Sequence, residues 1–206
     1  MTTTELSLHG FAVYESAIAK NLCDMCVDEI NQKSENIFEW TTPLAQELRL
    51  CMYNILRREG LRCHGTAELH VFNRGIGREW QTAWHDDDPE TYELPKGPDR
   101  IFACAYLTPT TYGRGALRVI PNSHKGGYES FRCQIRAFKK WVDEYPEGKN
   151  CGWTRFPDLY EAHADQETVA VSSGTIVVCD EKIIHGTEPN VGQRRRTMAL
   201  YWLEVK

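Results

Sequence analysis

Trp84-His85-Asp86-Asp87 is the stretch of the chain that most constrains its fold. On a β-strand, side chains alternate between the two faces, so His85 and Asp87 of this H-x-D pair would point to the same side. A second histidine, His185, follows 98 residues after Asp87 (185 − 87 = 98) and must come from another strand of a closed or sandwiched sheet. Two imidazoles and one carboxylate can hold iron(II) on one triangular face and leave the other positions open for an oxidisable co-substrate and dioxygen. The spacing therefore predicts a metal site whose ligands are His85, Asp87 and His185.

Asp88 is a second carboxylate that could compete for this metal. On a strand it would lie on the face opposite to His85, so Asp87 is the expected ligand. A single histidine or aspartate in a strand is more often a structural or surface residue than a ligand. The prediction therefore rests on the three ligands taken together.

The composition is that of an ordinary globular protein. The 206 residues are 41% hydrophobic and 26% charged, and a single domain over residues 1–206 is long enough to bury a substantial core. The net charge of −5 does not indicate a nucleic-acid-binding surface, and no apolar stretch approaches the roughly 20 residues that span a bilayer. Residues Met1–Glu5 lack the basic and apolar regions of a secretory signal. We therefore expect a soluble, cytoplasmic protein with neither nucleic acid nor membrane as a partner; the oligomeric state stays open.

Eight cysteines raise the question of a disulfide or zinc framework. Without export, a disulfide framework is not expected. Cys23 and Cys26 form a C-x-x-C pair, and no second pair follows at zinc-ribbon spacing. The pair lies in a helical pattern, which favours two half-buried thiols over a redox or metal role.

Two helices are expected in the first third of the chain. Apolar residues recur at a helical period in Ala17–Gln32, where Ser16 can cap the start. A second helix is expected over Leu44–Arg58, with Pro43 near its first turn. These helices would pack on the outside of a sheet.

Strands are expected after the helices, which indicates an α+β architecture whose catalytic part is an all-β jelly roll. Residues 1–65 would form a helical support, and residues 66–206 the jelly-roll core. A polar, aromatic insert near 126–166 would begin with a helix over Ser130–Tyr145 and continue irregularly. The expected strands are Ala67–Phe72, Ile101–Leu107, Gly115–Ile120, Thr168–Val171, Thr175–Cys179 and Met198–Val205.

Four ordered blocks of the chain resemble a known family, the phytanoyl-CoA dioxygenase (PhyH-like) family. The resemblance implies an α+β, mainly β fold: a double-stranded β-helix, which is a cupin-like jelly roll, with flanking N-terminal helices. Asn122 departs from the pattern, since the family usually has glycine there, but asparagine tolerates such a turn almost as well. The blocks are Gly10-Phe11-Ala12-Val13, Trp84–Asp87, Gly113–His124, and Gly174–Val178 leading to His185-Gly186-Thr187.

The resemblance also implies the cofactors and the roles of individual residues. Fe(II) would be held by His85, Asp87 and His185, with 2-oxoglutarate as co-substrate and O2 as oxidant. Arg196, eleven positions after His185 (196 − 185 = 11), is expected to bind the distal carboxylate of 2-oxoglutarate. A planar guanidinium can bind a carboxylate through two hydrogen bonds and stays charged at any relevant pH.

Asn73 and Trp84 are predicted as further residues of the co-substrate site. Asn73 ends the strand before the ligand loop, and Trp84 would pack beside His85, although a structural tryptophan would look the same from the sequence. His70 could be a core histidine or a substrate contact. Other residues that could face the substrate, with no motif behind them, are Tyr92, Arg114, Arg118, Trp153 and Arg155.

These inferences favour a non-haem iron(II)/2-oxoglutarate-dependent dioxygenase that oxidises, and most simply hydroxylates, a C–H bond of a small-molecule metabolite. Succinate and CO2 would be released, and natural-product biosynthesis is the expected setting. Two alternatives stay open: a hydroxylase or demethylase of a macromolecule, and a non-enzymatic metal- or ligand-binding jelly roll. Iron-dependent succinate release would distinguish an enzyme from a binding protein, and the accepted substrate would distinguish the two kinds of enzyme.

Overall fold

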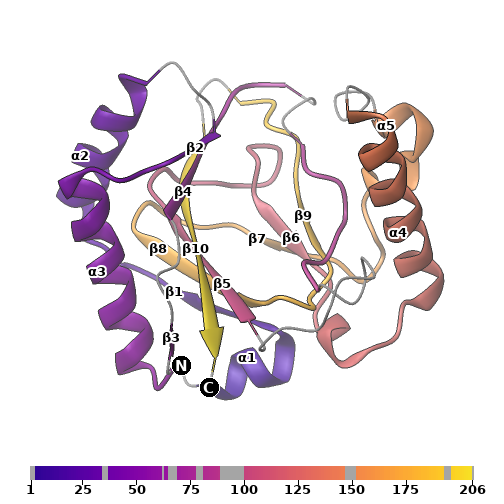
Figure 1. Ribbon diagram of the computed structural model, residues 1–206, viewed down its shortest axis with the longest axis horizontal. Helices are drawn as coiled ribbons and strands as arrows, with labels where there is room; N and C mark the ends of the chain where they lie inside the picture. The colour runs from indigo at the N-terminus through magenta and orange to yellow at the C-terminus, as the bar shows by residue number, and fades with distance from the viewer. Residues whose placement is uncertain are drawn as a thin grey trace.

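Two antiparallel β-sheets form the centre of the molecule, with helices on opposite sides of them (Figure 1). The structure is a computed structural model that describes residues 3–33, 37–61, 63–64, 69–77, 81–88, 100–146, 152–192 and 196–205. Within these ranges, only the backbone is described at residues 3–4, 37–38, 63–64, 73–74, 196 and 202–205.

The larger sheet has seven strands, in the order β1-β8-β5-β10-β4-β2, with β3 also paired to β10. Each of these pairs is antiparallel. Its members are β1 (Phe11–Tyr14), β2 (Ile37–Glu39), β3 (Cys63–His64), β4 (Leu69–Arg74), β5 (Arg100–Tyr106), β8 (Thr175–Asp180) and β10 (Arg196–Val205).

The smaller sheet has three strands in the order β7-β6-β9: β7 (Glu167–Val169), β6 (Leu117–Val119) and β9 (His185–Thr187). It faces the larger sheet, because Leu117 and Val169 share a buried cluster with Phe102 and Val177 of the larger sheet. A jelly roll consists of two antiparallel sheets packed face to face, as these two sheets are. The predicted α+β, mainly β, jelly-roll fold is therefore confirmed.

Strand β8 is apolar on both faces because both faces are covered. Ile176 and Val178 belong to the core shared with the helices, whereas Val177 and Cys179 face the smaller sheet. All four side chains are fully buried. A strand covered on both sides is a continuous apolar run instead of an alternating one.

Helices α1 (Thr3–His9), α2 (Lys20–Asn31) and α3 (Pro43–Arg58) belong to the N-terminal part of the chain. Buried residues of α2 and α3 pack against the outer face of the larger sheet, and Figure 1 shows both helices along one side of the strands. Thr42 caps α3 by accepting a hydrogen bond from the Ala45 N–H, and Pro43 occupies the first turn. The predicted cap of α2 is wrong: the helix begins three residues later than expected, after Ala19, which makes no side-chain cap bond.

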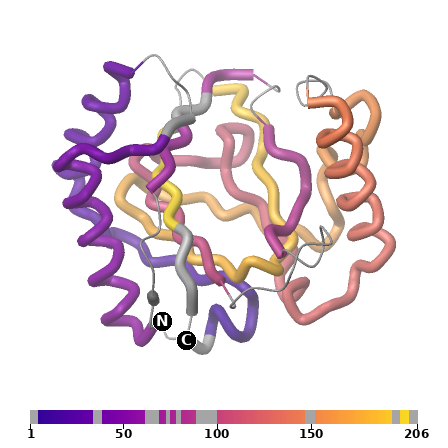
Figure 2. The backbone as a smooth tube through the Cα atoms, viewed as in Figure 1, coloured from indigo at the N-terminus to yellow at the C-terminus, as the bar shows by residue number. Residues whose placement is uncertain are grey.

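Helix α4 (Glu129–Glu144) and the short helix α5 (Gly152–Arg155) lie on the opposite side of the molecule, as Figure 2 also shows. They come from the insert near 126–166. The part predicted to be irregular packs closely where it is described, since Leu159 and Tyr160 join α4 residues in a third buried cluster. The insert therefore covers the end of the jelly roll that carries the Trp84–Asp87 segment.

The N-terminal residues contribute strands as well as helices. Strand β1 forms one edge of the larger sheet beside β8, and β2 pairs with β4 at the other edge. Asn122, at the position where the resembled family has glycine, adopts a left-handed conformation with φ 67°. Asparagine tolerates this conformation better than most residues, as the sequence suggested.

The Cys23 and Cys26 thiols are both fully buried on α2. Burial raises the pKa of the Cys26 thiol to about 12, so it stays protonated and unreactive. Among the described residues, no helix combines the length and the apolar character that crossing a membrane requires.

Gly174 joins the sheet to the N-terminal segment at a close approach of two backbones. Its N–H donates to the Tyr106 carbonyl at 2.8 Å, and its own carbonyl accepts from the Ile18 N–H at 2.9 Å. Its φ is +84°, and a Cβ at this position would lie 2.3 Å from the Ile18 carbonyl oxygen. The position therefore requires glycine for both conformation and space.

Gly174→Ala is expected to lower the free energy of unfolding by about 3 kcal/mol or more, because it adds left-handed strain to a backbone clash. Gly127→Ala is the matched control: Gly127 has nearly the same φ, +85°, but its Cβ would meet nothing within 4 Å. We expect a loss of about 1 kcal/mol there. Urea unfolding measures both values. Equal losses in the two variants would contradict the close approach at Gly174.

Candidate metal centre

His85, Asp87 and His185 lie together at one end of the jelly roll. Each offers a ligand atom, and these three atoms lie within 4.8 Å of one another. The Asp87 Oδ2 and His185 Nε2 atoms are 3.5 Å apart, and the two imidazole ring centroids are 4.1 Å apart. Two imidazole nitrogens and one carboxylate oxygen on one side of a point are a donor set that fits iron(II).

The backbone holds the two histidines side by side. The His85 N–H donates to the His185 carbonyl at 2.8 Å, and the His185 N–H donates back at 2.7 Å. His185 is the first residue of β9, but His85 forms an isolated bridge outside the named strands. The sequence pattern predicted that the H-x-D pair lies on an extended strand. This prediction is wrong, because His85 forms only an isolated bridge. Asp87 is fixed separately, because its N–H donates to the Glu181 carbonyl at 2.8 Å.

Each imidazole ring is oriented by a backbone carbonyl two residues earlier. The Nδ1 atom of His85 lies 2.8 Å from the Ala83 carbonyl oxygen, and Nδ1 of His185 lies 3.1 Å from that of Ile183. A carbonyl oxygen only accepts hydrogen bonds, so we assign the proton of each neutral ring to Nδ1. The lone pair of each Nε2 is then available to a metal. These carbonyl partners could not be identified from the sequence.

Burial favours the neutral forms of His185 and Asp87 in the metal-free protein. It lowers the pKa of the His185 imidazole well below its usual value; the neighbouring His85 lowers it further, and the Ile183 carbonyl acts in the opposite direction. Burial also raises the pKa of the Asp87 carboxyl, against the charges of His85 and Arg100. The neutral imidazole is the form that binds a metal. A divalent cation beside Asp87 would stabilise its carboxylate form.

A cavity of about 270 Å³ adjoins the three ligands. Thr82 and Thr187 lie on its wall beside the ligands, and the remaining lining is mainly apolar. Two of the lining residues, Met198 and Leu200, continue the face of Arg196 in the sequence pattern and were expected in the barrel interior. The others were not predicted, although the alternation of β5 could have grouped several of them. The remaining lining residues are Phe72, Phe102, Cys104, Tyr106 and Leu117.

Arg196 is the first residue of β10, where its backbone pairs with Arg74. Its side chain lies outside the described part of the structure, so its predicted role stays a prediction. By strand alternation, position 196 lies on the same face of β10 as Met198 and Leu200, which line the cavity.

Asn73 lies on β4, paired with Thr197, and its side chain is likewise not described. Alternation puts position 73 on the same face of β4 as Leu69 and Val71, which pack toward the helices. Phe72, which lines the cavity, belongs to the opposite face. This register gives no support to the prediction that Asn73 contacts the co-substrate.

Trp84 lies outside the cavity, in the buried cluster beneath the insert. Its indole Nε1 donates to the Glu161 carbonyl at 2.9 Å, and the Arg118 guanidinium lies 4.3 Å from the ring centroid. Arg118 is 1% exposed and donates to the carbonyls of residues 159–161, so it does not face a substrate. Both side chains attach the insert to the ligand loop.

The other candidate substrate contacts that the structure describes are not among the residues that line the cavity. Arg155 lies on α5, with its guanidinium 5.6 Å from the Trp141 ring centroid, and Trp153 packs near Tyr160. Arg114 forms a backbone bridge with Asn190. His70 is half-buried on β4, and Tyr92 lies outside the described residues.

A jelly roll with two histidines and one aspartate on the wall of a cavity is typical of a class of enzyme. The chain is an iron(II)/2-oxoglutarate-dependent oxygenase. It belongs to the phytanoyl-CoA dioxygenase (PhyH) family, whose model matches residues 9–198. This match confirms the resemblance inferred from the sequence, and with it the expected use of Fe(II), 2-oxoglutarate and O2.

Solved structures of similar fold include several metal-dependent enzymes. The iron-bound structure of HygX from Streptomyces hygroscopicus has a TM-score of 0.69 and 15% identity, over 98% of this chain and 85% of HygX. HygX with nickel, 2-oxoglutarate and hygromycin B bound has a TM-score of 0.65 and 13% identity, over 99% and 87% of the chains. SnoN, a non-haem α-ketoglutarate-dependent epimerase from nogalamycin biosynthesis, has a TM-score of 0.65 and 13% identity, over 97% and 79%. No curated protein matches the chain in sequence. Identities this low show a shared fold.

Asp87→Asn is expected to lower the affinity for iron(II) by more than roughly 100-fold, because it removes the anionic donor of the triad. Asp88→Asn is the matched control, since it removes the adjacent carboxylate and leaves the three ligands in place. Anaerobic equilibrium dialysis with iron(II) measures both affinities. Iron binding that survives Asp87→Asn but not Asp88→Asn would identify Asp88 as the ligand.

Proposed function

We propose that this enzyme uses 2-oxoglutarate and O2 to hydroxylate an unactivated C–H bond of a small-molecule metabolite, with release of succinate and CO2. The observation that carries the proposal is the position of the three ligands at the wall of a mainly apolar cavity of about 270 Å³. Bound iron(II) would supply the site at which 2-oxoglutarate and O2 react. The protein supplies the position of the ligands and an apolar enclosure.

Several residues of the chain have a definable part in this reaction. The carbonyls of Ala83 and Ile183 keep each Nε2 directed at the metal position. Phe102 stacks near His185, with ring centroids 4.8 Å apart, and covers that ligand on one side. The apolar walls exclude water from the reacting groups, which strengthens electrostatic contacts inside the cavity. Arg196 would bind the distal carboxylate of 2-oxoglutarate, because position 196 lies on the same face of β10 as Met198, which lines the cavity.

A small molecule is the proposed substrate, and natural-product biosynthesis the proposed setting. HygX has been solved with hygromycin B bound, and SnoN belongs to nogalamycin biosynthesis. Because SnoN is an epimerase, products have to be identified by mass as well as by succinate release: hydroxylation adds one oxygen atom, whereas epimerisation leaves the mass unchanged. A panel of small-molecule natural products that includes hygromycin B, screened for iron-dependent succinate release, tests the proposal.

Anaerobic addition of 2-oxoglutarate to the iron(II)-loaded protein is expected to produce a visible charge-transfer absorption band, because the co-substrate chelates the metal. His185→Ala should abolish the band by removing one metal ligand. Visible absorption spectroscopy follows the titration. Iron that binds without producing the band would refute 2-oxoglutarate as the co-substrate.

Arg196→Ala is expected to raise the 2-oxoglutarate concentration at half-saturation by roughly 10- to 100-fold, with iron affinity unchanged. Hydrogen bonds to charged groups contribute about 1.5–3 kcal/mol, and each 1.4 kcal/mol is a factor of ten in affinity. Arg195→Ala is the control, since the alternation of side chains expected on a strand points this neighbouring arginine away from the face of Arg196. Titration of the charge-transfer band measures the change, and an equal effect of both variants would contradict the assignment of Arg196.

A further inference from the structure

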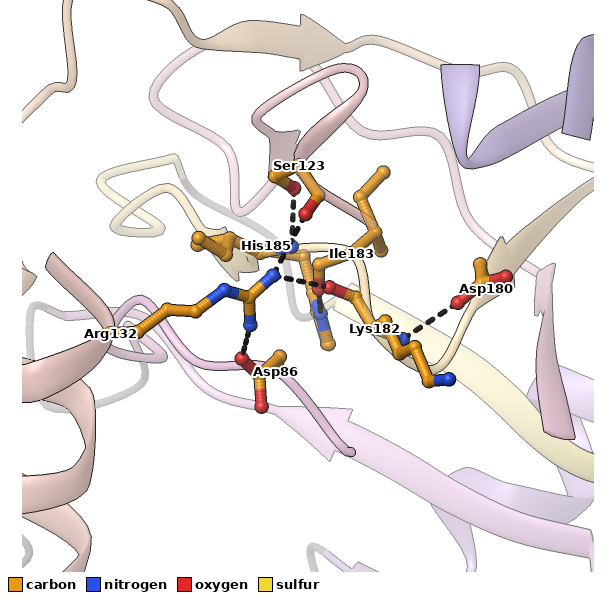
Figure 3. A network of polar contacts seen from close by, with 8 residues as sticks. Asp86, Ser123, Arg132, Asp180, Lys182, Ile183 and His185 are labelled. Carbon is orange, nitrogen blue, oxygen red and sulfur yellow. Dashed lines mark hydrogen bonds and ion pairs between the residues drawn. The ribbon is translucent and has the colours of Figure 1, made fainter. Parts of the chain in front are cut away.

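A buried arginine connects helix α4 to both segments that carry the metal ligands (Figure 3). The Arg132 side chain is 10% exposed and forms an ion pair with Asp86, whose side chain is fully buried. Asp86 stands between His85 and Asp87 in the chain, and its carboxylate turns toward α4 instead of the cavity. Neither residue was identified by the sequence analysis as part of the site.

The second terminal nitrogen of Arg132 binds two backbone carbonyls. It donates to the Ser123 carbonyl at 2.8 Å and to the Lys182 carbonyl at 3.0 Å. Lys182 lies in the loop three residues before His185. The Lys182 N–H donates to Asp180 Oδ1 at 2.8 Å, which is a second contact that holds this loop. The Ile184 N–H donates to the Ser123 hydroxyl at 2.8 Å. Ser123 therefore contacts both Arg132 and the residue next to His185.

We infer that Arg132 is a positioning residue for the metal centre: one guanidinium fixes the His85–Asp87 segment and the loop leading to His185 relative to each other. This inference rests on the proposed metal-dependent function. It goes beyond the ligands themselves, because it gives the insert near 126–166 a part in assembling the site. Arg132 touches neither a ligand side chain nor the cavity.

The chemistry of the contact requires arginine. A guanidinium presents its N–H donors in a rigid plane, so three acceptors on three segments are held in a fixed arrangement. A lysine ammonium could keep the charge beside Asp86 but has no such planar geometry. Loss of groups that orient metal ligands typically lowers metal affinity 10- to 100-fold.

Arg132→Lys tests the geometry while keeping the charge. Cobalt(II) is the probe, because its d–d absorption reports the arrangement of the ligands as well as the affinity. We expect Arg132→Lys to bind cobalt(II) roughly 10- to 100-fold more weakly than the unaltered protein, with a changed d–d spectrum. Urea unfolding of the metal-free proteins is measured alongside.

Val142→Ala is the matched control on the same helix. Val142 is buried on α4, 7% exposed, and outside the network, so its truncation weakens the packing of the helix without changing the Arg132 contacts. We expect a less stable protein whose cobalt affinity and spectrum are unchanged. Equal loss of cobalt affinity in Val142→Ala and Arg132→Lys, at equal loss of stability, would overturn the positioning role.

Arg132→Gln combined with Asp86→Asn guards against misfolding, since it leaves no unpaired buried charge. We expect this double variant to fold and still to bind cobalt(II) at least roughly 10-fold more weakly. Unaltered cobalt binding by both Arg132 variants overturns the inference and leaves the proposed function standing. Failure of the unaltered protein to bind cobalt(II) or iron(II) refutes the proposed function, and the inference with it.

Discussion

The reciprocal backbone hydrogen bonds between His85 and His185 determine the geometry of the site. They pair two segments that are distant in the chain, so that the imidazoles lie side by side with ring centroids 4.1 Å apart. Asp87 follows two residues later, and its own backbone bond to Glu181 brings its carboxylate to the same point. All three ligands are therefore set by main-chain contacts, which hold a geometry more firmly than flexible side chains do.

The layers around the sheets make this main-chain geometry rigid. One face of the larger sheet packs on the N-terminal helices, and the other face packs on the smaller sheet, so strands β5 and β8 are buried on both faces (Figure 1). The insert closes the remaining side, where Trp84 and Arg118 join it to the ligand loop. Close-packed surroundings leave the ligands few alternative positions, which is what a metal centre with a defined open side requires.

Local features of the sequence predicted the grouping of His85, Asp87 and His185, because the residue types themselves show the ligand chemistry. They also predicted the extent of α3, because the helical period and Pro43 mark that helix in the sequence. Contacts between distant segments were not predictable. Arg132 and Asp86 are 46 residues apart, and a buried ion pair leaves no periodic signal in the sequence. The strand assumed for the H-x-D pair is one isolated bridge instead: His85 pairs with His185, whereas the Asp87 N–H donates to the Glu181 carbonyl.

Three successive aspartates in a partly buried loop would repel one another if all faced one way. Asp86 turns to Arg132. Asp87 faces the cavity, and among the described lining residues it alone carries a carboxylate. Arg100 binds Glu181 at 2.9 Å, which compensates a further buried carboxylate close to the loop. A divalent cation beside Asp87 and two neutral imidazoles would retain a net positive charge, and this charge favours an anionic co-substrate such as 2-oxoglutarate. The ion pair at Asp86 thus keeps a second negative charge away from the metal position, so the electrostatics of the site depend on the insert that supplies Arg132.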